Sequence, residues 1–371
     1  MSLSPRGISV ALVWMIAACD APPESAPPPS LPEPDLAGVE PRVRLFLEDA
    51  RRKVALDPAS QTAWGTYAMA LDAHEMYDEA AVAYREAHRL EPGEFRWPYL
   101  LARVIEVRGE SAGTVQEAAE LVRSALRLRP YYAPAHVRLG ELEAQVGRTR
   151  PAEDAYRRAI ELNPKLTKPH AALARILVAD GRAAEARALL ERVRDERLED
   201  WEIETTLTRV YGALGERDLA RAAAERAKAL PQSDRFVDPV AAEPMSYGVS
   251  STICFKRARV LAMAGQFEDA IQNLKVVVEV KPDYAPAQGR LGLCYAETGD
   301  VELAIRHLGR AIELEPDLAV ERLTLARMLE SAGDPSSARE HRERARVLDP
   351  ELFTADTSTA TFVNASSTFD E

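Results

Sequence analysis

Cysteine and aromatic side chains are scarce in this 371-residue chain, and its 47 lysine and arginine residues are outnumbered by 59 acidic ones. The three cysteines, Cys19, Cys254 and Cys294, follow no zinc or redox spacing, and we expect the last two to be small core residues. The net charge of -12 argues against general nucleic-acid binding, which needs a basic surface. Aromatic residues make up only 6% of a composition dominated by alanine, leucine, arginine and glutamate, which favours helices over strands.

Sequence motifs for catalysis and metal binding are missing as well. The chain has no Gly-x-Ser-x-Gly elbow, no phosphate-binding glycine loop and no His-Glu-x-x-His sequence. Its six histidines are scattered along the chain at unlike positions. We therefore predict that the protein is not an enzyme and that it needs neither a cofactor nor a metal.

The N-terminal residues carry the pattern of an export signal. An apolar run at residues 8–16 is far shorter than the roughly 20 residues that a membrane-spanning helix needs. The next residues resemble the lipobox of bacterial lipoproteins, in which a diacylglycerol is joined to the cysteine of Ile16-Ala17-Ala18-Cys19. The resemblance implies a signal peptide at 1–18, a lipid on Cys19, and a place in the bacterial cell envelope facing the periplasm or the exterior. Whether the membrane is the inner or the outer one stays open.

A repeating pattern fills most of the remaining chain. Sequences of the form Leu-x-Pro or Val-x-Pro recur, and the last three end at Pro282, Pro316 and Pro350, 34 residues apart. Between them, small residues recur where helices would cross, and glycine recurs where a helix would end. Proline then prevents the next helix from continuing. This spacing and these residues resemble the tetratricopeptide repeat.

The resemblance implies an all-α fold, a right-handed α-solenoid of about eight helix-turn-helix repeats. Each repeat buries its apolar face only by stacking on its neighbours. We expect four extra residues around 109–113 to lengthen the turn inside the second repeat. The eight repeats are assigned to residues 61–94, 95–132, 133–166, 167–200, 201–234, 251–284, 285–318 and 319–352.

Four segments flank or divide the repeats. Residues 19–38 are rich in proline and are predicted to form an extended tether of ~3.1 Å per residue. Residues 39–60 contain a capping helix. An insert at 235–250 separates repeats 1–5, at 61–234, from repeats 6–8, at 251–352, as a hinge or as a rigid wedge.

Two smaller features accompany these segments. Asp238 and Pro239 suit the start of a short helix in the insert. The tail at 353–371 is polar, and its fragment 361–364 is a candidate short strand or docking segment.

A basic stripe is the strongest candidate binding surface. Positions 2, 5, 9 and 12 of each first helix lie on one side of that helix, and in the resembled family this side lines a groove that binds peptides. Arginine recurs at position 9, and its planar fork suits carboxylates. Two aromatic residues at position 5 are candidate apolar anchors for a partner. The candidate partner-binding residues are Arg103, Arg138, Arg175, Arg209, Lys256, Arg259, Arg290, Arg327, Tyr99 and Phe255.

Two interpretations of this stripe remain open. Each arginine pairs with an acid of its own array, such as Glu106, Glu202 or Glu330, or the stripe recruits an acidic segment or the C-terminal carboxylate of another chain. The aromatic residues likewise either anchor a partner or pack against the next repeat.

We predict a non-catalytic scaffold of the bacterial envelope that binds a protein or peptide, with no nucleic acid or metal. The alternatives are a structural, self-assembling protein and an accessory subunit of an envelope enzyme complex. The likeness in plan to repeat-containing lipoproteins identifies no particular partner.

Overall fold

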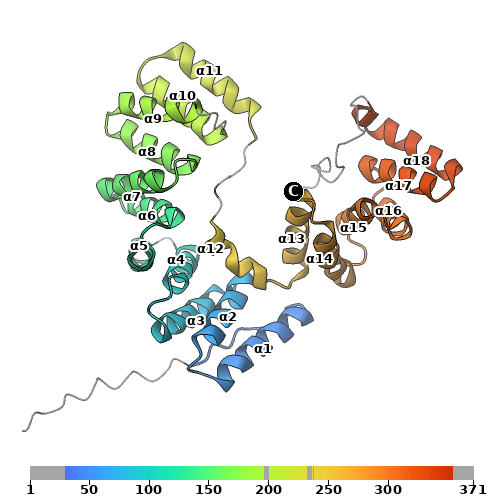
Figure 1. The fold of residues 1–371 in the computed structure, drawn as a ribbon, viewed down its shortest axis with the longest axis horizontal. Helices are drawn as coiled ribbons and strands as arrows, with labels where there is room; N and C mark the ends of the chain where they lie inside the picture. The colour runs from blue at the N-terminus through green and yellow to red at the C-terminus, as the bar shows by residue number, and fades with distance from the viewer. Residues whose placement is uncertain (1–29, 110, 196–199, 232–235, 237, 354–371) are drawn as a thin grey trace, which may run out of the picture. The chain divides into compact units, whose positions relative to one another are not determined.

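Figure 1 shows the computed structural model, which describes residues 30–109, 111–195, 200–231, 236 and 238–353. Within these ranges the chain forms 18 α-helices and two 3₁₀ helices, and no described residue lies in a strand. The predicted all-α fold is confirmed. The predicted signal peptide, Cys19 and the fragment 361–364 lie outside the described residues.

The helices follow one another as antiparallel pairs, one pair for each assigned repeat. The first helices of the pairs are α2 (Gln61–Ala73), α4 (Arg96–Arg108), α6 (Ala133–Gln145), α8 (Thr167–Ala179), α10 (Trp201–Ala213), α13 (Ser251–Met263), α15 (Ala285–Thr298) and α17 (Ala319–Ser331). The second helices are α3 (Tyr77–Leu90), α5 (Ala112–Leu128), α7 (Thr149–Leu162), α9 (Ala183–Asp195), α11 (Arg217–Ala229), α14 (Phe267–Val280), α16 (Val301–Leu314) and α18 (Pro335–Leu348). Each helix packs on the one that follows it in its pair.

Close helix crossings explain the small residues at the eighth position. A Cβ atom added to Gly140 would lie 2.6 Å from the Tyr156 ring, and one added to Gly292 would lie 2.8 Å from the backbone nitrogen of Leu308. Both distances are too short for carbon in a packed interior. The two helices of a repeat therefore approach each other closely because a side chain is missing there.

Positive φ angles explain the glycines at the turn. Gly181 has φ of 76° and Gly299 has φ of 83°, and both end the first helix of a pair. Glu75 occupies the same place in the first repeat with φ of 63°, a conformation that costs a residue with a Cβ atom roughly 1–2 kcal/mol. The first repeat thus holds a strained turn that the others avoid.

The extra residues of the second repeat do not lengthen its turn, as had been predicted. Helix α4 ends at Arg108 and α5 begins at Ala112, a spacing like that of the other pairs. Instead, α5 is 17 residues long, whereas the other second helices have 13 or 14. The reason is local: the Ser111 hydroxyl accepts a hydrogen bond from the Thr114 nitrogen and caps a helix that starts early.

The predicted tether at 19–38 is not separate from the folded array over its whole length. Pro32 and Pro34 are buried, and Leu31 packs on the core beside α1 (Pro41–Leu56) and α2. The buried Tyr67 hydroxyl donates a hydrogen bond of 2.9 Å to the Pro32 carbonyl oxygen. A buried hydroxyl needs an acceptor, and this stretch of backbone supplies one. The end of the proline-rich segment is therefore part of the folded array.

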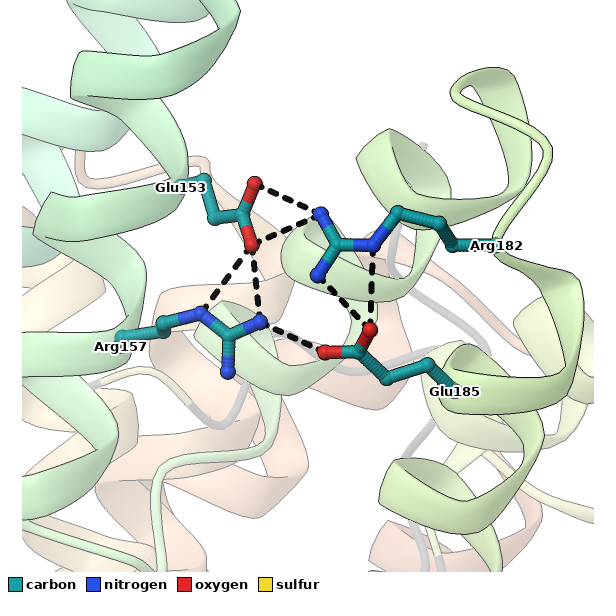
Figure 2. A network of polar contacts seen from close by, with 4 residues as sticks. All are labelled: Glu153, Arg157, Arg182 and Glu185. Carbon is teal, nitrogen blue, oxygen red and sulfur yellow. Dashed lines mark hydrogen bonds and ion pairs between the residues drawn. The ribbon is translucent and has the colours of Figure 1, made fainter.

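Ion pairs link second helices of successive repeats. Figure 2 shows a closed group in which Glu153 of α7 binds both Arg157 and Arg182, and both arginines also bind Glu185 of α9. The Arg157–Glu185 pair measures 2.6 Å between its closest atoms, and hydrogen bonds from Arg157 lower the pKa of Glu153. These four residues join the third repeat to the fourth without using their first helices.

The repeats after the insert have a core of their own. Apolar residues of α13 to α18 form one cluster, which contains Cys254 and Cys294 as buried free cysteines, as predicted. The insert contains α12 (Pro239–Ala242) and the 3₁₀ helix η1 (Glu243–Tyr247), and Asp238 caps α12 as predicted. A last 3₁₀ helix, η2 (Pro350–Phe353), packs on α18.

Candidate functional site

The predicted binding residues lie on the first helices of the repeats, and most of those before the insert already have partners. Arg103 of α4 forms an ion pair with Asp72 of α2, whose side chain is fully buried. The same carboxylate accepts a hydrogen bond of 3.0 Å from the Tyr84 hydroxyl. Because a buried charge needs a counter-charge, Arg103 stabilises the fold and is not a free contact for a partner.

Further basic residues of the stripe bind acids of the neighbouring repeat. Arg138 lies 2.6 Å from Glu106, and Arg175 lies 2.9 Å from Glu202. Both acids had been named as possible internal partners, whereas Glu330 pairs with Arg342 at 2.7 Å, outside the stripe. Internal pairing thus describes the basic residues of the stripe from α4 to α8.

A hollow of about 800 Å³ brings Arg103 and Arg138 to one wall. It opens near the ends of α4 and α6, and both of its arginines already hold acids. The hollow is therefore electrostatically compensated, and it lacks the unmatched charge that would draw in a small anion.

Two of the predicted basic residues differ from the paired ones described above. Arg209 of α10 and Lys256 of α13 are exposed, and neither makes an ion pair or a hydrogen bond with any residue that the structure describes. Arg259 and Arg327 are exposed as well. The basic interpretation of the stripe therefore rests on the surface from α10 onward.

Phe255 packs against the next repeat. Its ring meets Tyr284 edge-on, with centroids 5.3 Å apart, and the guanidinium of Arg290 lies 5.7 Å from the ring centroid. Arg290 is only 8% exposed. Phe255 of α13 and Arg290 of α15, both candidate partner contacts, therefore contact each other within the chain.

Tyr99 is an anchor, but for a segment of its own chain. Its ring is fully buried and stacks on Phe95, 5.2 Å away between centroids. Its hydroxyl donates a 2.5 Å hydrogen bond to the Asp238 carboxylate, and the Tyr132 hydroxyl donates one of 2.6 Å to the other carboxylate oxygen. The prediction that Tyr99 is available to an outside partner is wrong in this conformation, because the insert already occupies it.

The remainder of the insert continues along the same helices, as Figure 1 shows for α12 beside α4. Val240 is 6% exposed and belongs to the core formed by α1 to α6. Glu243 lies 3.5 Å from Arg96, and the backbone nitrogen of Val249 donates to the His74 ring over 3.3 Å. Residues 238–249 of the insert are therefore bound along repeats 1–5, which we call the first array, and the role of the insert as a hinge or as a rigid wedge stays a prediction.

Sequence reasoning missed the residues that hold the insert. Tyr132, which directly precedes α6, was not a candidate. Asp238 was recognised only as a helix cap. The sequence contained one signal. An acidic residue lies in the insert, and the candidate groove of the same chain is rich in hydroxyl and guanidinium donors.

Two general features of the described residues bear on the choice of function. Among them, no group of three or more histidine, cysteine or acidic side chains is placed to hold a metal ion. Within the same residues, every helix is too short or too polar to cross a bilayer.

Comparison with known proteins agrees with the helix pairs. A tetratricopeptide-repeat family model matches residues 145–202 and 261–320. Among solved structures, a MamA protein is 19% identical over 48% of this chain and 98% of its own, with a TM-score of 0.42. A tetratricopeptide-repeat protein from Parabacteroides merdae is 16% identical over 67% of this chain and 89% of its own, with a TM-score of 0.43.

A third solved structure, YrrB, is described as a tetratricopeptide-repeat protein with an unusual peptide-binding site. It is 15% identical over 67% of this chain and 98% of its own, with a TM-score of 0.27. No protein with curated annotation matches the chain. The family model thus matches two segments of the chain, and helix pairs of the same kind occur in the other assigned repeats that the structure describes.

Proposed function

We propose that this protein is a non-catalytic scaffold that binds polypeptide segments on the first helices of its repeats. One observation carries the proposal: the first array already binds a segment that is not part of a repeat, 238–249, through hydroxyl, guanidinium and apolar side chains. A surface that holds one such segment has the chemistry to hold another. The exposed Arg209 and Lys256 extend this surface toward acidic partners.

We further propose that the scaffold is held at a bacterial membrane by a lipid on Cys19. Only the sequence Ile16-Ala17-Ala18-Cys19 supports this part. A lipid anchor concentrates the repeats near the membrane without a spanning helix. The scaffold then meets its partners on the periplasmic or the outer side.

Cross-linking in intact cells, with the full-length chain as bait, tests the scaffold. We expect the wild-type chain to capture defined proteins, and the double variant Arg209→Glu, Lys256→Glu to capture at least tenfold less of any acidic one. Arg221→Glu is the matched control, because Arg221 is an exposed arginine on the second helix α11. If the wild-type chain captures no protein above an anchored control, the scaffold proposal fails.

A further inference from the structure

The insert crosses the first array against the order of its repeats. Phe236 lies under the ammonium group of Lys168 of α8, 5.0 Å from the ring centroid. Asp238 binds Tyr132 and Tyr99, and Val249 binds His74 after α2. From Phe236 to Val249 the chain thus contacts the fourth, second and first repeats in turn, on the side predicted to bind peptides.

The length of this connection is not required by the stacking of repeats. Helix α14 ends at Val280 and α15 begins at Ala285, so a short loop joins one repeat to the next. By contrast, α11 ends at Ala229 and α13 begins only at Ser251. The additional residues between α11 and α13 form a segment that lies along the first array of the same chain.

The site that binds the Asp238 side chain, formed by Tyr99 and Tyr132, is specific for a carboxylate. The two tyrosine hydroxyls each donate to a different oxygen of the same carboxylate, and the guanidinium of Arg138 lies 5.7 Å from the centre of the Tyr99 ring. Burial, and after it the charge of Asp238, raises the pKa of Tyr99 well above its usual value. The hydroxyl therefore keeps its proton at neutral pH and acts only as a donor toward an acid.

The residues that follow Asp238 alternate between buried and exposed side chains. Val240 is the buried aliphatic side chain two residues on, whereas Pro239 and Ala242 are exposed. Helix α12 has only four residues and is capped by the same Asp238 carboxylate, which accepts from the Ala241 nitrogen over 3.1 Å. Asp238 and Val240 thus supply a polar and an apolar contact two residues apart, and further along the segment the buried Pro244 of η1 packs where η1 meets α2.

We propose that the first helices of repeats 1–3 form a recognition site for an acidic segment of a partner protein, and that residues 238–249 are its built-in competitor. The preferred partner segment carries a carboxylate followed two residues later by an aliphatic side chain at the start of a helical turn. The partner binds by displacing residues 238–249. This inference rests on the proposed scaffold function and names the chemistry and the regulation of one of its surfaces.

The competitor reduces the affinity for a partner in a way that can be measured. A tethered segment acts at an effective concentration of about the millimolar range. The apparent affinity of a free segment falls by the fraction of molecules in which the site is open. A chain whose own segment cannot bind should therefore bind the same sequence in solution more tightly than the wild-type chain does.

The test uses a fluorescent peptide with the sequence of residues 236–249 and the full-length chain, with binding followed by anisotropy. The opened variant Asp238→Ala, Val240→Asp should bind the peptide at least tenfold more tightly than the wild-type chain. A peptide with alanine in place of Asp238 should bind the opened variant at least tenfold less tightly. Adding Tyr99→Phe and Tyr132→Phe to the opened variant should abolish binding.

Two results contradict the inference. One is an opened variant that keeps its helical circular dichroism and yet binds the peptide no better than the wild-type chain. The other result is measured on the wild-type chain, so it tests the inference even if the opened variant fails to fold. Chymotrypsin cleavage at Tyr247 should accelerate when excess peptide displaces the segment, and an unchanged rate shows that residues 238–249 are a fixed structural element.

A matched control is Glu302→Ala, which removes an acid from the second helix α16, where the side chain is 84% exposed. It should leave peptide binding unchanged. Failure of this inference is distinguishable from failure of the scaffold proposal. In the first case cells still yield cross-linked partners but the peptide does not bind, and in the second no partner is captured at all.

Discussion

Replacing Arg103 by methionine tests whether the basic stripe of the first array is structural. The Asp72 side chain is fully buried, and Arg103 supplies its counter-charge while Tyr84 donates a hydrogen bond. Removing one partner of a buried ion pair costs about 3–5 kcal/mol, because the other charge is left uncompensated. The Arg103 side chain is 22% exposed, so water can reach part of the vacated site. We therefore expect the free energy of unfolding to fall by about 3 kcal/mol, the lower end of that range.

Urea denaturation followed by tryptophan fluorescence measures this loss where it occurs. Trp64 and Trp97 are both 2% exposed and lie on α2 and α4, the two helices that the ion pair joins. Because each repeat contacts mainly its neighbours, the loss should appear as earlier unfolding of these repeats before the whole chain melts. Circular dichroism, which follows all helices, should show a smaller change in midpoint.

Two variants make the reasoning falsifiable. Arg209→Met removes an exposed arginine that has no ion pair within the described residues, and it should change stability by no more than about 0.5 kcal/mol. The double variant Asp72→Asn, Arg103→Met should recover most of the loss, because no uncompensated charge remains. If Arg103→Met costs less than about 1 kcal/mol, or if Arg209→Met costs as much, the structural assignment of Arg103 is wrong.

Four further predictions follow from single contacts. Glu75→Gly should stabilise the protein by about 1 kcal/mol in thermal denaturation by relieving a positive φ, whereas Gly181→Ala should destabilise it by a similar amount; opposite signs would refute the turn argument. Burial lowers the pKa of His74 below its ordinary value of 6.5, against the opposing charge of Glu40, so stability is complete above pH 6.5 and declines as the pH falls toward the folded-state pKa. A His74→Gln variant should lose that slope in urea midpoints measured across pH. Glu153→Gln should cost about 1 kcal/mol at low salt and less at high salt, because ion pairs near a surface are screened. Cys19→Ser should move the protein from the membrane fraction to the soluble fraction, and unchanged fractionation would exclude the lipid anchor.

The helix pairs could be predicted because their signals are local. The turn glycines and the prolines after the second helices act within a few residues, and their effect does not depend on distant parts of the chain. The length of α5 could not be predicted in this way. Ser111 is a good cap, and the sequence offered no reason to prefer a long helix over a long turn.

The partners of the stripe could not be predicted in the same way. Arg103 and Asp72 are 31 residues apart, and Arg138 and Glu106 are 32 apart, so their meeting depends on how neighbouring repeats stack. Tyr99 and Asp238 are separated by 139 residues. An aromatic residue that anchors an acidic segment could be inferred from the sequence. That the acid belongs to the same chain could not be inferred.

The contact between Glu40 and Ser251 has a consequence for how the chain folds. The Glu40 carboxylate accepts a 2.9 Å hydrogen bond from the Ser251 nitrogen, although the two residues are 211 positions apart. Stacked repeats otherwise fold through contacts between near neighbours, which form quickly. Closing a loop of this length costs chain entropy that only a completed first array can offset. We expect this closure to be the slow, final event in the folding of the chain.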